Sequence, residues 1–219
     1  MLLNEGVGDV GFFEIDEGPL PYGISIAVPL SQAIIDEIEN EPTHTYFNHY
    51  RSVNFFIDQM LLKAGLFLER NGYRYITVAA SQSINKDGWN YSGRFSHKAG
   101  ARLAGMGSIG KSALFIHKKY GPAVRLGTVF TDCPFDVSEN EIVESPCGEC
   151  NACAKACPAG AIKGKCFLEG MEREEIFDPA KCSDYMKNKF KNIGRGAVCG
   201  LCIKACVKAN QKRNNTHSI

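Results

Sequence analysis

Hydrophobic and polar positions before residue 132 follow patterns that predict a mixed α/β structure. The apolar, β-branched run at 22–30 is typical of a buried strand. Residues 46–72 carry apolar side chains at helical spacing and end at an Asn-Gly pair, which predicts one long helix. Residues 73–81 predict another strand.

Capping residues place two further helices. Ser31 is positioned to cap a helix through Glu39, and Ser96 is positioned to cap a helix over 97–104. Residues 112–132 then predict two strands joined around a Gly-Pro pair. The order of elements is therefore helix, glycine-rich loop and strand in the middle of the chain.

All ten cysteines follow residue 132. This change in composition predicts two domains, at 1–132 and 133–219. The second consists of short helices and loops, with a weak internal repeat between its two cysteine-rich segments. The fold class expected from these patterns is α+β, with an α/β domain followed by a cysteine-rich domain.

Composition and charge exclude several classes of protein. A hydrophobic fraction of 44% and a charged fraction of 22% are ordinary for a globular chain, and a net charge of +1 gives no bulk attraction to nucleic acid or membrane. We find no apolar run of about 18 residues and no secretory signal, so a cytoplasmic location is expected. In the cytoplasm ten cysteines favour metal or redox chemistry over disulfides.

The densest cysteine motif occupies 147–158 and reads C-x2-C-x2-C-x3-C-P. This is the bacterial ferredoxin pattern for a [4Fe–4S] cluster. Zinc sites usually pair two C-x2-C knuckles across a longer loop, so iron–sulfur is the better interpretation. In two-cluster proteins the fourth cysteine of the motif ligates the neighbouring cluster, which predicts a second cysteine group.

That second group is present as C-x2-C-x3-C near the end of the chain. Two ligand sets follow from counting, with Cys182 as the best candidate for the missing eighth ligand. The first set is Cys147, Cys150, Cys153 and Cys206, and the second is Cys157, Cys182, Cys199 and Cys202. Cys133 and Cys166 are isolated and are interpreted as packed free thiols.

Basic residues gather in the second domain. Residues 181–213 contain nine Lys or Arg and one acid, Asp184. The favoured interpretation is that they offset the negative charge of two clusters or dock an acidic electron donor of low potential, such as a ferredoxin or flavodoxin. Nucleic-acid binding is the alternative.

The glycine-rich stretch at 105–112 matches two nucleotide-binding patterns at once, G-x-G-x-x-G and G-x4-G-K-S. Both patterns function only when a strand precedes the glycines and a helix follows them. Here the predicted order is reversed, so nucleotide binding is not favoured. The glycines would instead allow a tight turn without a ligand, or close approach of the backbone to a large flat group.

Taken in order, the helix at 97–104, the glycine loop, the ferredoxin motif, "KCSDY" and the second cysteine group resemble the epoxyqueuosine reductases and, more distantly, the reductive dehalogenases. This resemblance implies an N-terminal nitroreductase-like domain that binds cobalamin and a ferredoxin-like domain with two [4Fe–4S] clusters. It also implies that Cys182 is the extra ligand. The cofactor contacts implied around the loop are Gly105, Gly107, Ser108, Gly110 and Lys111, with His97 as a further candidate.

The departures from that family bear on the chemistry. The aspartate expected as proton donor falls near Tyr91 in an ungapped match, and Ser108 replaces a tryptophan. Tyr91 with Lys98 or Arg94 would resemble the tyrosine and basic neighbour of the dehalogenases, and a surface aromatic is the alternative. His97 would be either a proton donor or a structural residue. The short chain after Cys206 leads us not to expect a tRNA substrate.

The predicted function is a cobalamin-dependent iron–sulfur reductase that acts on a small organic substrate. Electrons would enter through the two clusters and reach the corrinoid, while the protein positions the cofactor and supplies a proton. The alternative is a non-enzymatic electron-transfer protein with two [4Fe–4S] clusters that reduces a partner or a corrinoid protein. Flavin in place of the corrinoid rests on the nitroreductase analogy alone.

Overall fold

The computed structural model describes residues 1–84 and 91–216. It divides into two compact units, each assembled from three stretches of chain. Unit 1 contains residues 1–29, 51–108 and 124–144, and unit 2 contains 30–50, 109–123 and 145–219. The two units are interleaved along the sequence. The division predicted from the sequence instead gives two consecutive domains that meet at residue 132, and it stays a prediction.

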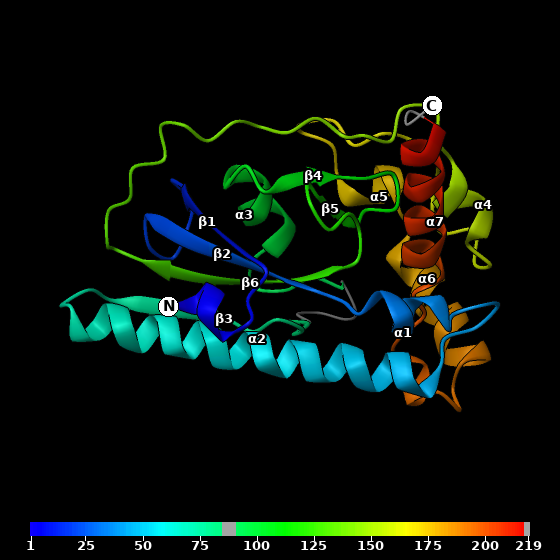
Figure 1. The fold of residues 1–219 in the computed structure, drawn as a ribbon, viewed down its shortest axis with the longest axis horizontal. Coiled ribbons are helices and arrows are strands. Elements are labelled where there is room, and N and C mark those ends of the chain that lie inside the picture. The colour runs from blue at the N-terminus through cyan, green and yellow to red at the C-terminus, as the bar shows by residue number, and fades with distance from the viewer. Residues whose placement is uncertain (85–90, 217–219) are drawn as a thin grey trace. The chain divides into compact units, whose positions relative to one another are not determined.

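Figure 1 labels the helices and strands along the chain. Those of the first half are η1 (Leu2–Glu5), β1 (Asp9–Glu14), β2 (Tyr22–Pro29), α1 (Gln32–Asp36), α2 (His44–Arg70), β3 (Tyr75–Val78), α3 (His97–Leu103) and β4 (Gly107–Ile109). Those of the second half are β5 (Phe115–His117), β6 (Val124–Thr131), α4 (Ala152–Ala156), α5 (Arg173–Ile176), α6 (Pro179–Lys189), η2 (Gly194–Gly196) and α7 (Leu201–Thr216). Within the described residues no helix is both long enough and apolar enough to cross a bilayer.

An antiparallel sheet forms the centre of unit 1. Its strand order is β1-β2-β6-β3 in the part of the chain that the structure describes. Strand β2 pairs with β6 from Tyr22 opposite Thr131 to Pro29 opposite Val124. The predicted strands at 22–30 and 73–81 and the long helix at 46–72 are present as β2, β3 and α2, with small shifts at their ends.

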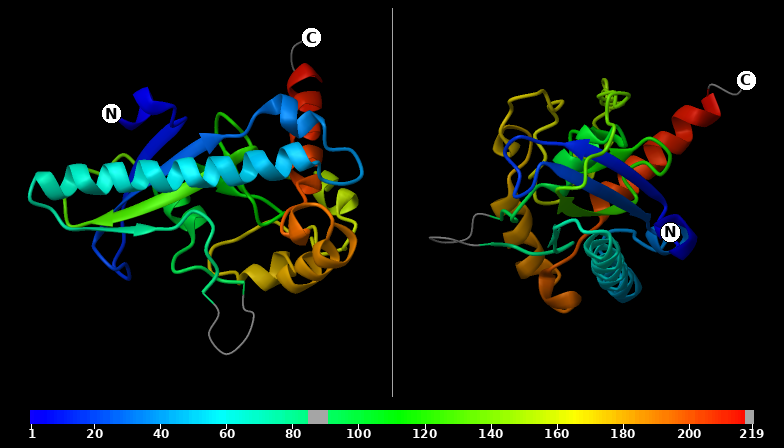
Figure 2. Two further views of the ribbon diagram at one scale, coloured as in Figure 1. Left: turned by 90° about the horizontal axis from the view of Figure 1, so that it is seen from below. Right: turned by 90° about the vertical axis from the view of Figure 1, so that its left-hand side faces the viewer.

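Helices cover both faces of this sheet, and glycines let them approach closely. Figures 1 and 2 show α2 and α3 on opposite sides of the strands. A Cβ at Gly127 of β6 would lie 2.4 Å from Ile57 of α2. On the other face a Cβ at Gly100 of α3 would lie 2.9 Å from the Phe13 ring of β1, so glycine lets α3 pack closely against the sheet. Small residues therefore fix the distance between helix and sheet.

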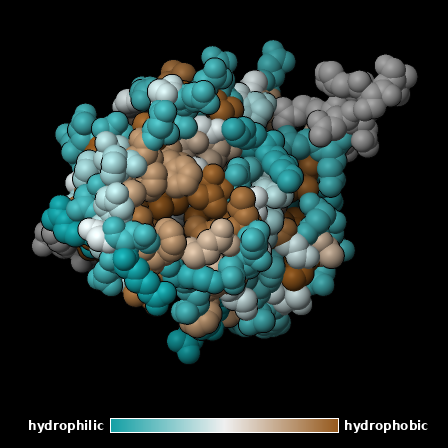
Figure 3. All heavy atoms as spheres, turned by 60° about the vertical axis from the view of Figure 1, so that its left-hand side comes forward, coloured by the Kyte–Doolittle hydropathy of each residue, from teal (hydrophilic) through white to brown (hydrophobic). Residues whose placement is uncertain are grey.

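Apolar side chains also reach the surface. Figure 3 shows them gathered around a hollow on the face that it presents. Exposed apolar residues in unit 1 include Phe12, Phe55, Leu62 and Phe67. The Phe12 ring contacts the Phe135 ring at a centroid distance of 4.5 Å. Exposed apolar side chains of this kind are normal on protein surfaces.

Two predicted elements differ in the structure. Strands form on either side of the Gly-Pro pair, but β5 pairs with β4 whereas β6 lies inside the four-stranded sheet. A run of apolar residues predicts a strand without specifying its partner. The helix after Ser31 ends at Asp36 instead of Glu39, and the Ser31 side chain makes no capping hydrogen bond.

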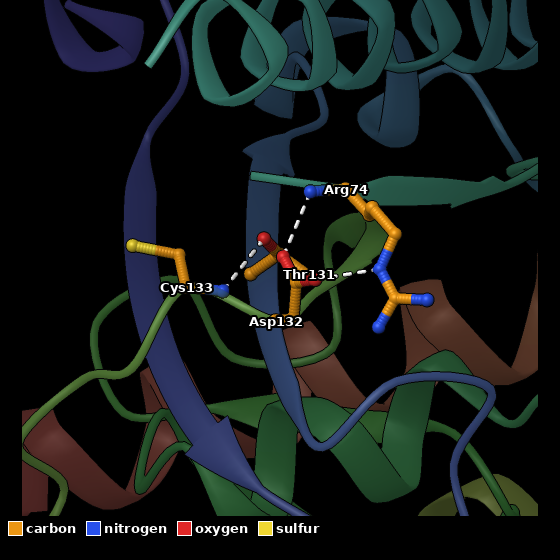
Figure 4. A network of polar contacts seen from close by, with 4 residues as sticks. All are labelled: Arg74, Thr131, Asp132 and Cys133. Carbon is orange, nitrogen blue, oxygen red and sulfur yellow. Dashed lines mark hydrogen bonds and ion pairs between the residues drawn. The ribbon is translucent and has the colours of Figure 1, made fainter. Parts of the chain in front are cut away.

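A polar network closes one end of the β3–β6 pair (Figure 4). Asp132 follows β6, and its carboxylate accepts hydrogen bonds from the Arg74 backbone N–H at 2.7 Å and from Arg74 Nε at 2.6 Å. Thr131 Oγ1 accepts a hydrogen bond from the Cys133 N–H at 3.1 Å. These bonds hold the chain where it enters β3 and leaves β6.

Replacing Asp132 by Asn should lower the melting temperature at neutral pH by only about 1–3 °C, because the Arg74 side chain of the pair is largely exposed to water. The hydrogen bond from Arg74 lowers the pKa of Asp132. The Asp132 carboxylate therefore contributes its full stabilisation of the folded state above the pKa of an unfolded aspartate, about 3.9. This stabilisation is lost as the pH falls through the lower pKa of the folded state. Thermal unfolding of both proteins against pH should show the difference vanish in acid; a constant difference would contradict the role of the charge.

Candidate iron–sulfur centres

The first cysteine group lies in a tight loop followed by a short helix. The Cys150 N–H donates to the Cys147 carbonyl at 2.8 Å, and Gly148 adopts a positive φ of 45° between them. Cys153 lies in the first turn of α4 and is buried. Burial raises the pKa of Cys153, and the neighbouring Cys147 and Cys150 thiols raise it further. The three side chains are thus close enough to interact electrostatically.

The second group gathers cysteines that are distant in sequence. Cys182 comes from α6, and Cys202 comes from the first turn of α7. Burial raises the pKa of Cys182 to about 12, and the Cys199 and Cys157 thiols add to this rise. Burial also strongly raises the pKa of Cys202, with further contributions from Cys199, Cys182 and Cys157.

These four thiols are thus close enough to interact electrostatically, and their assignment as the ligands of one cluster stays a prediction. Crowded, buried thiols resist ionisation, and a bound metal cluster would hold them as thiolates. This chemistry fits a [4Fe–4S] cluster, which needs four thiolates. Cys206 lies one turn after Cys202 on α7, and α7 packs against α4, the helix that carries Cys153.

No group of three or more His, Cys, Asp or Glu among the described residues is arranged to hold a single metal ion. A zinc ion draws its sulfurs to about 2.3 Å from one centre. A cube of four irons spreads its thiolates farther apart, so a cluster does not require a single-ion arrangement.

Cys133 and Cys166 belong to neither group of predicted ligands and are half-buried. The Cys166 Sγ lies 3.9 Å from the Gly148 carbonyl oxygen, and the Cys133 Sγ lies 4.0 Å from the Pro134 carbonyl oxygen. Their interpretation as free thiols stays a prediction.

An ion pair anchors the helix that carries Cys202 and Cys206. Lys204 Nζ lies 2.5 Å from Asp36 Oδ1, and the Lys204 side chain is only 9% exposed. The hydrogen bond from Lys204 lowers the pKa of Asp36. This contact joins α1 to α7 within unit 2. Spacing rules missed it because Asp36 lies far away in sequence, although a lysine between two ligand cysteines was a usable signal.

The glycine loop has the predicted order of elements. Helix α3 precedes it, and β4 and β5 follow within the described residues, so no helix N-terminus faces the loop from the C-terminal side. Gly105 has a positive φ of 63°, whereas Gly107 is nearly extended. Ser108 is 3% exposed, and its hydroxyl has no hydrogen-bond partner among the described residues.

The end of the loop contacts the first cysteine segment. Lys111 is 5% exposed, and its Nζ donates to Asn151 Oδ1 at 3.2 Å. A Cβ at Gly110 would lie 3.4 Å from Cys147 Sγ. Asn151 was not predicted to matter, because it occupies a variable position of the cysteine motif.

His97 is held by both of its ring nitrogens. Nδ1 lies 2.9 Å from Thr128 Oγ1 and Nε2 lies 3.1 Å from the Ala79 carbonyl oxygen. A carbonyl only accepts, so Nε2 carries the proton and Nδ1 accepts from Thr128. These bonds give His97 a structural role, fastening the start of α3 to the sheet. Its predicted contact with a cofactor stays a prediction.

The predicted catalytic pair lies in unit 1. Tyr91 is half-buried and has a positive φ of 53°, and Lys98 lies on α3. Positive φ is uncommon for a tyrosine and marks a constrained backbone. The role of Tyr91 and Lys98 in proton transfer stays a prediction.

Comparison with known proteins defines the class of the cysteine-rich segment. Residues 146–208 match the family model described as a 4Fe-4S double cluster binding domain. Two curated relatives are called epoxyqueuosine reductase. The protein of Listeria monocytogenes is 32% identical in a match that covers 52% of this chain and 30% of the relative. The protein of Gloeobacter violaceus is 39% identical in a match that covers 52% of this chain and 36% of the relative.

Solved structures share the fold. One is a reductive dehalogenase whose structure is described as suggesting a mechanism for B12-dependent dehalogenation. It has a TM-score of 0.72 and 17% identity to this chain, and the match covers 94% of this chain and 30% of the dehalogenase. Epoxyqueuosine reductase from Streptococcus thermophilus has a TM-score of 0.57 and 20% identity, covering 94% and 63%. The resemblance inferred from the sequence is thereby confirmed, and this chain matches about a third of the length of those curated relatives.

Replacing Cys182 by Ala should remove one cluster and spare the other. Iron in anaerobically reconstituted protein should fall from about eight to about four per chain. Replacing Cys133 by Ala is the matched control, which should keep about eight, because its thiol contacts the neighbouring Pro134 carbonyl, outside both groups of predicted ligands. Eight irons in the Cys182 variant, or four in the control, would contradict the ligand sets.

Replacing His97 by Gln should lower the free energy of unfolding by about 1–3 kcal/mol, because two buried polar partners lose their bonds. Burial lowers the pKa of His97. The wild type should thus lose stability as pH falls below about 6.5, where only the unfolded histidine takes up a proton, and the variant should lose this dependence. Denaturant unfolding above and below that pH measures both effects, with exposed His44→Gln as control.

Proposed function

We propose that this chain is an iron–sulfur oxidoreductase in which two [4Fe–4S] clusters carry electrons to a bound cobalamin. The observation that supports it most directly is the convergence of Cys157, Cys182, Cys199 and Cys202 inside a domain of the double-cluster class. Crowded thiols from three separate segments of the sequence have little structural use without a metal.

The two clusters have interlaced ligands in this proposal. Cys147, Cys150, Cys153 and Cys206 hold the first cluster, and Cys157, Cys182, Cys199 and Cys202 hold the second. Because α4 carries Cys153 and ends at Cys157, one short helix serves both clusters. Adjacent clusters suit passage of electrons through the domain.

Cobalamin is the proposed electron acceptor. When bound, it would supply a cobalt centre that accepts electrons and attacks the substrate. The residues that would hold it are those of the glycine loop, and the unpartnered Ser108 hydroxyl fits a group that brings a hydrogen-bonding partner. The fold shared with a dehalogenase described as B12-dependent supports the same assignment.

The chain would contribute the proton. The Tyr91 phenol is the proposed donor, and Lys98 is the proposed basic neighbour that stabilises the phenolate left behind. The substrate is proposed to be a small organic molecule. The electron donor would be a low-potential protein of the ferredoxin or flavodoxin type, attracted by the basic residues between 181 and 213.

The expectation against a tRNA substrate loses its support. The curated relatives bear the name of an enzyme that acts on epoxyqueuosine, and no conclusion about tRNA follows from where this chain ends. A nucleoside substrate therefore belongs among those to be assayed.

Adding cobalamin to anaerobic protein that contains about eight irons should shift the corrinoid absorption band. Replacing Ser108 by Ala should weaken binding about fivefold, the effect of one hydrogen bond. Ser25→Ala is the matched control, because its hydroxyl is also buried without a partner but lies on β2. Equal weakening in both variants would contradict the role of the loop. No band shift with intact clusters would instead favour the electron-transfer protein.

A further inference from the structure

Gly110 and Lys111 end the glycine loop and belong to a phosphate-binding sequence pattern. The order of helices and strands around the loop does not favour phosphate binding here. In the structure both residues contact the first cysteine segment. Gly110 leaves room for Cys147, since an added Cβ would meet its Sγ at 3.4 Å and Ile116 Cδ1 at 2.6 Å. Lys111 donates from Nζ to Asn151 Oδ1 at 3.2 Å. All of these residues lie within unit 2.

Lys111 is a buried cation without a carboxylate partner. It is 5% exposed, and no carboxylate within the described residues lies at ion-pair distance from its Nζ. A neutral amide oxygen compensates little of the cost of burying an ammonium group. Lys204 gives a contrast in the same unit, because it is similarly buried but pairs with Asp36 at 2.5 Å.

A thiolate-ligated cluster would supply the missing negative charge. Asn151 lies between Cys150 and Cys153, so the bond from Lys111 ends inside the loop that would wrap the first cluster. A cluster becomes more negative when reduced, and nearby charge and hydrogen bonding tune its potential. A fixed cation in a low-dielectric surrounding stabilises the reduced form most.

We infer that Lys111 is a positioning and tuning residue for the first cluster: it orders the cysteine loop through Asn151 and raises the reduction potential of the cluster held by Cys147, Cys150, Cys153 and Cys206. This inference rests on the proposed ligand sets. It assigns the lysine of the glycine loop to the iron–sulfur domain, where the resemblance had implied a corrinoid contact. Electrons would then be drawn to the first cluster.

The test is a potentiometric titration of the anaerobically reconstituted full chain, followed by electron paramagnetic resonance. Lys111→Met should lower the midpoint potential of one cluster by about 59 mV, which is a tenfold change for a one-electron couple. Lys111→Arg keeps the charge and should stay close to wild type. Lys155→Met removes an exposed lysine of α4 and should shift the potential much less, because water screens it.

The Cys182→Ala background identifies the affected cluster, since only the first cluster should remain there. In the Cys182→Ala background, Lys111→Met must again lower the reduction potential of the remaining cluster. An unchanged potential in this double variant overturns the inference. Equal potentials in Lys111→Met and wild type, or equal shifts in the Met and Arg variants, also overturn it.

If Lys111→Met loses about four irons, the iron content of Lys111→Arg decides the outcome. If Lys111→Arg retains them, the cation is required and the inference stands; if both variants lose them, packing alone explains Lys111 and the inference fails. Wild-type protein with fewer than about eight irons would instead refute the proposed function, so the two failures are distinguishable.

Discussion

Cys202 lies in unit 2 close to the thiols of Cys157, Cys182 and Cys199, and burial raises the pKa of Cys182, Cys199 and Cys202. Such a cluster of side chains is costly as thiolates and gives little packing as thiols. Iron changes this balance, because it holds the sulfurs deprotonated and joins segments far apart in sequence. Folding of this unit and assembly of its clusters are therefore expected to be one coupled equilibrium.

Helix α7 is where these constraints meet. It carries Cys202 and Cys206, packs against α4 and is tied to α1 by Lys204 and Asp36. A change in its register by one residue would turn both cysteines away from their partners. This ion pair, in which Lys204 is buried and Asp36 is exposed, is one of the contacts that fix the register, because a charged contact tolerates a shift less well than an apolar one.

Local rules predicted what local interactions determine. The long helix ends close to its Asn-Gly pair, and Ser96 accepts the capping bond from the Ala99 N–H at 3.4 Å. The cysteine groups were predictable because ligand spacing is imposed by the cluster itself. The pairing of β5 with β4, the bonds of His97 and the Asp36–Lys204 ion pair depend on side chains meeting across long separations, which no periodicity encodes.

The glycine loop shows how the same residue types serve a different chemistry when the order of elements changes. A phosphate loop presents backbone N–H groups at the start of a helix, and its lysine neutralises a phosphate. Here the Gly110 N–H donates to the Leu114 carbonyl at 2.9 Å, closing a turn between β4 and β5. That N–H is therefore not available to an anion, whereas the Lys111 ammonium still is. A glycine beside a lysine thus keeps the ability to approach and neutralise a bulky negative group, and the neighbouring Cys147 makes an iron–sulfur cluster the group that fits.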